Sequence, residues 1–152
     1  CAIEVDDDFN EIDSFHAFIN PQRKVPWFVT RIHGLNNEFL DDKPIFSDIG
    51  RDLLLFLEGS ELWAHNMSFD AGMLNAEFAR NRLPTLEKVD CRLNCTLQLA
   101  RSTFPGQKNS LDALLDRFAI DRSERRLHGA MIDTRLLVKV YQNLVSYRTK
   151  TS

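Results

Sequence analysis

Cysteine is scarce in this sequence, which has only Cys1, Cys91 and Cys95 among 152 residues. A small, odd number of cysteines argues against a disulfide-stapled secreted scaffold and favours a reducing compartment, so we expect a cytoplasmic protein. Cys91 and Cys95 have no histidine near them in the sequence and would make a poor zinc site. Packed, reduced thiols are the simpler interpretation.

Long apolar runs and an excess of positive charge are also absent. The longest run, residues 53–57, is flanked by charge and falls far short of the roughly 20 residues that a membrane helix needs. We therefore expect a buried helix face and no membrane partner. The net charge of −3 disfavours a protein that coats long duplex nucleic acid. It leaves room for an enzyme that holds a few nucleotides through metal ions, because metal-binding carboxylates make a bare site negative.

What the sequence does contain is typical of one globular domain, and we expect a single domain over residues 1–152. Hydrophobic residues make up 43% and charged residues 27%, and the length allows a sizeable core. Residue patterns predict a mixed α/β fold without internal repeats. The predicted strands are residues 2–5, 16–19, 61–66 and 89–93. The predicted helices start at Pro44, Ser68, Thr96, Asn109 and Gly129.

Asp70 is the first candidate site residue. It follows the predicted strand at residues 61–66 and falls in the first turn of the next helix, where the helix dipole favours an ionised carboxylate. Carboxylates at strand ends of open α/β sheets are well placed for an active site. Taken alone, Asp70 is better explained as a structural residue that satisfies the dipole.

His128 and Asp133 form a second candidate, five residues apart at a predicted loop–helix junction. Gly129 and Ala130 leave space beside the histidine. Asp133 lies beyond the capping positions and next to apolar neighbours such as Leu136, so its carboxylate needs a partner, and a cation is a natural one. Histidine is a ready general base near neutral pH. The pair is more informative than either residue alone.

Two other polar segments are most simply structural. In residues 104–112, Pro105 and Gly106 favour a turn, and Asn109 or Ser110 favours a helix cap. Residues 6–8 are three aspartates that fit the solvated end of a hairpin.

Together, five segments resemble the DEDDh 3′-5′ exonuclease family, and within it the proofreading subunits of bacterial DNA polymerase III. They run in the family's order over nearly the whole chain, and their combination is far more specific than any one motif. The segments are Arg31-Ile32-His33-Gly34-Leu35 with Glu38-Phe39-Leu40 and Lys43-Pro44; His65-Asn66 with Phe69-Asp70; Leu99-Ala100-Arg101 with Phe104-Pro105-Gly106; Asn109-Ser110-Leu111-Asp112-Ala113-Leu114; and Leu127-His128-Gly129-Ala130 with Asp133.

The resemblance implies an RNase H-like mixed sheet flanked by helices. It also implies hydrolysis of DNA from a single-stranded 3′ end, with release of nucleoside monophosphates and a replicative polymerase subunit as partner. Two divalent ions, Mg²⁺ or Mn²⁺, would be bound in part by Asp70 and Asp133, and His128 would be the general base. Four further residues would line the pocket for the terminal nucleotide: Ile32, His33, Asn66 and Phe69.

The chain also departs from the family pattern. The family opens with a strand that carries an Asp-x-Glu pair of metal ligands, whereas Cys1-Ala2-Ile3-Glu4-Val5 resembles the family's second strand. We therefore expect the chain to start downstream of that motif, to lack the central strand of the sheet, and to be weakly active or inactive by itself. Cys95 stands where relatives often have Asp, which would weaken a helix cap.

Two alternatives remain open at this point. One is a related exonuclease that trims RNA or repairs DNA outside a replicase. The other is a catalytically inactive scaffold that binds a polymerase or a nucleic-acid end. The presence of Asp70, His128 and Asp133 argues against the scaffold, and the expected lack of the first motif argues for it.

Overall fold

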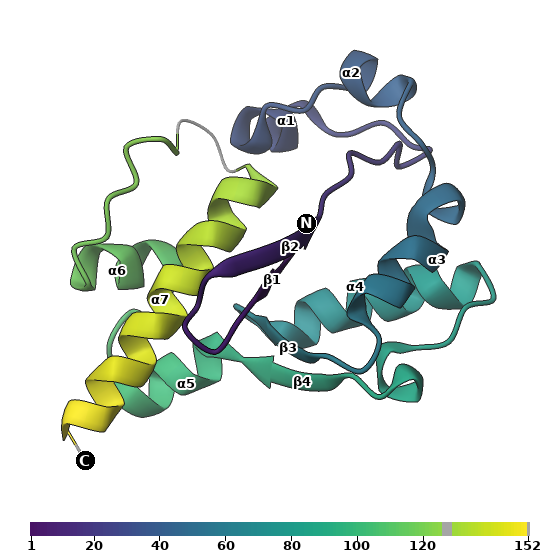
Figure 1. Ribbon diagram of the computed structural model, residues 1–152. Helices are drawn as coiled ribbons and strands as arrows, with labels where there is room; N and C mark the ends of the chain where they lie inside the picture. The colour runs from purple at the N-terminus through teal and green to yellow at the C-terminus, as the bar shows by residue number, and fades with distance from the viewer. Residues whose placement is uncertain (126–128, 152) are drawn as a thin grey trace.

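The computed structural model describes residues 1–125 and 129–151, and it has a mixed α/β fold, as predicted (Figure 1). The first half contains β1 (Ala2–Val5), β2 (Glu11–Phe15), α1 (Trp27–His33), α2 (Asn37–Asp41), α3 (Phe46–Leu57) and β3 (Glu61–Ala64). The second half contains α4 (Met67–Arg80), the 3₁₀ helix η1 (Leu86–Val89), β4 (Arg92–Cys95), α5 (Thr96–Thr103), α6 (Leu111–Arg117) and α7 (Ala130–Thr151).

The strands form two separate pairs. β1 and β2 are antiparallel, with Ala2 opposite Phe15, and β3 and β4 are parallel, with Glu61 opposite Arg92. Within the described part of the chain, no strand pairing joins the two sheets. These small sheets, flanked by helices, agree with the predicted α/β fold class.

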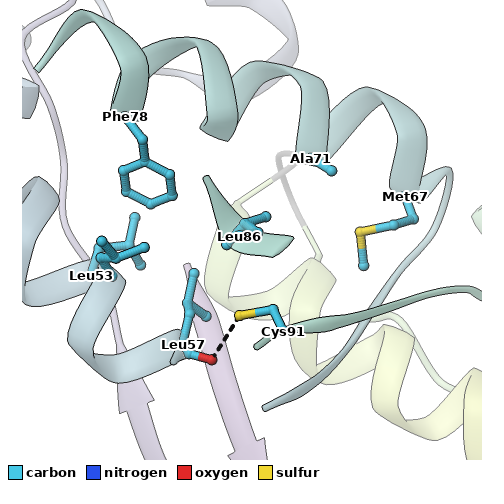
Figure 2. Close-up of a cluster of buried hydrophobic side chains, with 8 residues drawn as sticks. Leu53, Leu57, Met67, Ala71, Phe78, Leu86 and Cys91 are labelled. Carbon is cyan, nitrogen blue, oxygen red and sulfur yellow. Dashed lines mark hydrogen bonds between the residues drawn. The ribbon is translucent and has the colours of Figure 1, made fainter. Parts of the chain in front are cut away.

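Two hydrophobic cores hold the helices in place. Figure 2 shows the first, where α3 and α4 pack over η1 and the start of β4, and Phe78 and Leu86 are almost fully buried. The Sγ atom of Cys91 donates to the carbonyl oxygen of Leu57 at 3.1 Å in this core, as expected for a packed, reduced thiol. The second core joins α5, α6 and α7, and its buried members are Ala100, Phe104, Leu114, Leu115, Leu136, Val140 and Leu144.

Helix α7 connects the two sheets through side chains. The ring of Tyr141 lies 5.6 Å from that of Phe9, in the β1–β2 turn, and 4.3 Å from that of Trp63 on β3. Arg135 forms two hydrogen bonds with the carboxylate of Glu11 on β2, at 3.0 and 3.1 Å. Helix α7, which lies beside the hairpin in Figure 1, is thus one of its attachments. The other is the first core, where the ring of Phe15 lies 6.0 Å from that of Phe56.

The second hairpin strand lies earlier than predicted, at Glu11–Phe15 instead of residues 16–19. The carboxylate of Asp6 accepts the backbone N–H groups of Asp8 at 2.9 Å and Asn10 at 2.8 Å, which reverses the chain early. The first four residues of β2 are exposed, so no alternation of apolar residues marked the strand.

Two other predicted element boundaries were wrong by a few residues. α3 begins at Phe46 instead of Pro44, because the carboxylate of Asp48 accepts the backbone N–H of Ile45 at 3.1 Å. β4 begins at Arg92 instead of residue 89, because η1 occupies the preceding residues and ends at Asp90 with a φ of 60°. The helix α5 has the predicted bounds.

The described residues include no helix that combines the length and the low polarity needed to cross a membrane.

Candidate active site

A tight strand–helix turn places Asp70. Asn66 adopts a left-handed conformation (φ 80°, ψ 57°), which asparagine tolerates better than most residues, and its carbonyl accepts the N–H of Phe69 at 3.0 Å. The helix α4 begins at Met67, one residue before the predicted start at Ser68, and it has no side-chain cap. Asp70 lies in the first turn of α4, as predicted.

His65 fixes this turn to the neighbouring elements. Its Nδ1 lies 2.9 Å from Oγ1 of Thr96, at the start of α5, and its Nε2 lies 2.9 Å from the carbonyl oxygen of Asn109. A carbonyl oxygen can only accept, so Nε2 carries a proton. Burial lowers the pKa of His65, although the bond to Asn109 opposes the shift. The neutral ring therefore acts as a rigid support next to Asn66.

The turn that carries Asn109 is structural, as predicted. The Nδ2 group of the buried Asn109 donates to the carbonyl oxygens of Phe104 at 3.1 Å and Gln107 at 3.0 Å. The hydroxyl of Ser110 accepts the N–H of Ala113 at 3.2 Å and caps α6. This segment holds the carbonyl to which His65 binds.

Asp70 is an exposed residue, yet its carboxyl group is partly desolvated by the atoms around it. Desolvation by surrounding atoms raises its pKa, opposed by its own backbone N–H, by His65 and by the amino group of Cys1. A carboxyl group that is costly to ionise gains most from a bound cation.

Asp133, in the first turn of α7, is engaged by Arg125. Its Oδ1 lies 2.6 Å from Nε of Arg125, and its Oδ2 accepts from Nη2 of Arg125 at 3.2 Å. The Arg125 side chain is only 8% exposed and also pairs with Asp112. A cation that binds Asp133 must share its carboxylate with this guanidinium or displace it.

The first turns of α4 and α7 meet at the start of β1. The Cys1 amino group interacts electrostatically with Asp70, and the Cys1 Sγ lies 3.7 Å from Sδ of Met131, close to Asp133. Figure 1 shows this end of β1 beside the start of α7. The first turns of both helices thus approach the start of β1, although the carboxylate of Asp133 itself is bound by Arg125. His128 lies outside the described residues.

The predicted substrate-binding residues divide between two elements. Asn66 and Phe69 belong to the α4 turn, and Phe69 is 62% exposed. Ile32 and His33 end α1; Ile32 is 53% exposed, and Nδ1 of His33 accepts the N–H of Leu35 at 2.9 Å. Within the described ranges, no hydrogen bond, ion pair or ring contact joins the two groups. The shared pocket stays a prediction.

Comparison with known proteins gives the family. The RNase_T family, described as Exonuclease, matches residues 1–141. The chain belongs to this exonuclease family. It is 39% identical over 137 residues to DNA polymerase III subunit epsilon of Pasteurella multocida, covering 90% of this chain and 54% of that protein. The same subunit of Rickettsia conorii is 46% identical over 141 residues, with coverages of 89% and 59%.

A solved structure of the exonuclease fold supports the assignment. Exonuclease X, in complex with 5′ overhanging duplex DNA, superimposes with a TM-score of 0.68 and 26% identity, covering 95% of this chain and 79% of that one. The chain spans little more than half the length of the two epsilon subunits.

The fit of the exonuclease residues to divalent ions is incomplete. Asp70 and Asp133 are hard oxygen donors of the kind that Mg²⁺ and Mn²⁺ prefer. Among residues 1–125 and 129–151, however, no three His, Cys, Asp or Glu side chains gather as a metal site. The described residues therefore do not form a complete metal centre.

The contacts of Arg125 are not apparent from the sequence. Its side chain is only 8% exposed, although it belongs to a charged segment. Arg125 lies outside any helix or strand, so no period relates it to Asp133 and only the folded chain brings the two together.

Proposed function

We propose that this chain is the exonuclease domain of a 3′-5′ exonuclease that removes nucleoside monophosphates from DNA 3′ ends during replicative proofreading. The observation that carries the proposal is that the chain belongs to an exonuclease family over residues 1–141. The approach of the first turns of α4 and α7 to the start of β1 supports it, because these turns carry Asp70 and Asp133. We propose one domain for the whole chain.

The residue roles follow from chemistry. We propose that Asp70 and Asp133 contribute ligands to two divalent ions, Mg²⁺ or Mn²⁺, which when bound neutralise the phosphate in phosphoryl displacement. His128 would take a proton from the attacking water. Ile32, His33, Asn66 and Phe69 would line the site of the terminal nucleotide; the exposure of Ile32 and Phe69 supports this role.

The relatives suggest the partners. Two relatives named DNA polymerase III subunit epsilon support association with a replicative polymerase in the cytoplasm. A structural neighbour that binds duplex DNA with a 5′ overhang supports DNA as the substrate. A single-stranded 3′ end is the part of that substrate we propose to be cleaved.

The test uses the full-length protein, a 5′-labelled DNA oligonucleotide and Mg²⁺ or Mn²⁺. We expect His128→Ala, Asp70→Asn and Asp133→Asn each to lower the cleavage rate about 100-fold or more. Asp52→Asn, the same change at an exposed position of α3, is the matched control and should leave the rate unchanged. Full activity in Asp70→Asn and Asp133→Asn would disprove the residue roles.

One observation favours a second candidate, an inactive scaffold: the carboxylate of Asp133 is paired with the guanidinium of Arg125. Full-length protein that cleaves neither DNA nor RNA with Mn²⁺, yet binds DNA ends, would establish the scaffold. Faster cleavage of an RNA oligonucleotide of the same sequence would instead indicate an RNA-trimming exonuclease.

A further inference from the structure

Helix α1 presents an unusual aromatic surface. Trp27 is 70% exposed, Phe28 is 56% exposed and Ile32 is 53% exposed, and none of the helix's residues is buried. The rings of Trp27 and Phe28 lie edge to face, 6.0 Å apart. Figure 1 shows α1 at the margin of the molecule. Exposed aromatic pairs of this kind mark binding surfaces more often than folding contacts.

The charged side chains of the segment that carries these rings are all positive. Residues 21–37 contain Arg23, Lys24 and Arg31 and no acidic residue, in a chain whose net charge is −3. The guanidinium of Arg31 lies 5.6 Å from the ring centroid of Trp27. Arg23 and Lys24 precede Trp27 by three to four residues and so lie within about 14 Å of it. An anionic partner with flat, apolar groups matches this combination.

The surface is held in a fixed position. The side chain of Asn37 accepts the N–H of Val25 at 2.7 Å and donates to its carbonyl oxygen at 3.2 Å, which clamps the segment on both sides of α1. Gly34 ends the helix with a φ of 75°, and its N–H donates to the carbonyl of Thr30 at 2.7 Å. A preorganised surface loses less entropy when a ligand binds.

We infer that Trp27 and Phe28, with Arg31, form a stacking platform for the bases of single-stranded DNA upstream of the terminal nucleotide. This inference rests on the proposed function, because α1 also carries Ile32 and His33, assigned above to the terminal nucleotide. Bases stack on exposed aromatic rings, and cations beside the rings meet the phosphates. The platform thus extends the proposed site along the strand.

The test compares substrate lengths in the full-length protein. Trp27→Ala should raise KM for a twelve-residue oligothymidine about tenfold and leave kcat unchanged. It should leave KM for a dinucleotide, which is too short to reach the platform, unchanged. Trp27→Phe should retain wild-type KM, and Leu55→Ala, at a 63% exposed position of α3, is the matched control. An equal change in KM for the two substrate lengths would overturn the platform. An unchanged KM for both lengths would also overturn it and would instead indicate that α1 is a protein-docking surface.

A binding measurement separates this inference from the proposed function. Trp63→Phe leaves Trp27 as the sole tryptophan of the chain described here. Titration of this variant with the twelve-residue oligothymidine in a chelator should quench the fluorescence of Trp27, even if the protein cleaves nothing. Absence of quenching overturns the platform, whereas quenching without cleavage supports the platform and contradicts only the nuclease proposal.

Discussion

The ion pair between Arg125 and Asp133 makes a quantitative prediction about stability. Arg125→Ala removes a guanidinium that is 8% exposed and that binds two carboxylates, of which Asp133 is 26% exposed and Asp112 is 53% exposed. The change removes the guanidinium from the partly buried carboxylate of Asp133.

The magnitude follows from burial. Breaking a fully buried pair costs about 3–5 kcal/mol, whereas exposed pairs contribute about 0–1 kcal/mol. Because Asp133 retains some contact with water, we expect Arg125→Ala to lower the free energy of unfolding by about 2 kcal/mol. In a domain of this size, that loss lowers the Tm by roughly 6 °C.

The assay is urea and thermal unfolding of wild type, Arg125→Ala, Asp133→Asn and the double variant. The double-mutant cycle should give a coupling energy of about 1–2 kcal/mol between Arg125 and Asp133. Arg92→Ala is the matched control, because Arg92 is 80% exposed and its pair with Glu61 spans 3.4 Å. That variant should change stability by less than about 0.5 kcal/mol.

A coupling energy near zero would refute the reasoning, since it would mean that the pair does not hold Asp133 in the folded protein. Equal losses of unfolding free energy in Arg125→Ala and Arg92→Ala would refute it as well, because the contribution of an ion pair would then not depend on its burial.

Two further predictions concern groups with shifted pKa values. Burial lowers the pKa of His65, so the unfolded state takes up a proton first as pH falls below about 6.5, and stability should decline from there toward pH 5. Urea unfolding across this range should show a smaller decline in His65→Gln, and identical pH profiles would exclude the histidine as the cause. The Cys91 thiol is 8% exposed and hydrogen-bonded to the Leu57 carbonyl, and burial raises its pKa. Ellman's reagent should therefore label the exposed Cys1 much faster than Cys91. Equal labelling rates in Cys1→Ser and Cys91→Ser variants would contradict the packing in Figure 2.

Elements with a strong apolar period could be predicted from the sequence. The spacing of Phe46, Ile49, Leu53 and Leu57 predicted α3, and all four pack in the first core. The position of the hairpin strand β2 was not predicted correctly, because its first four residues are exposed and its position depends on hydrogen bonds to Asp6. Local side-chain bonds of this type are not visible in a hydrophobic pattern.

The candidate site also combines features that the sequence predicts with features that it does not. Asp70 could be placed in the first turn of a helix from local sequence, and it lies there. Asp133 was expected beyond the capping positions, whereas it lies in the first turn of α7. The pairing of Arg125 with Asp133 depends on the path of a loop, and the anchoring of His65 depends on a carbonyl 44 residues away. Such contacts depend on tertiary structure, and the sequence near either residue does not predict them.

The attachment of the hairpin to α7 has a consequence for how this chain folds during synthesis. Glu11 meets Arg135 across 124 positions, and Cys1 meets Met131 across 130. The hairpin is therefore synthesised more than 100 residues before the helix residues that it contacts, and these contacts form late, whereas the contact of Phe15 with Phe56 can form earlier. Until α7 docks, the edges of the hairpin strands stay open to other chains. Removal of the part of α7 that carries Arg135 and Tyr141 should loosen a hairpin that lies far away in the sequence.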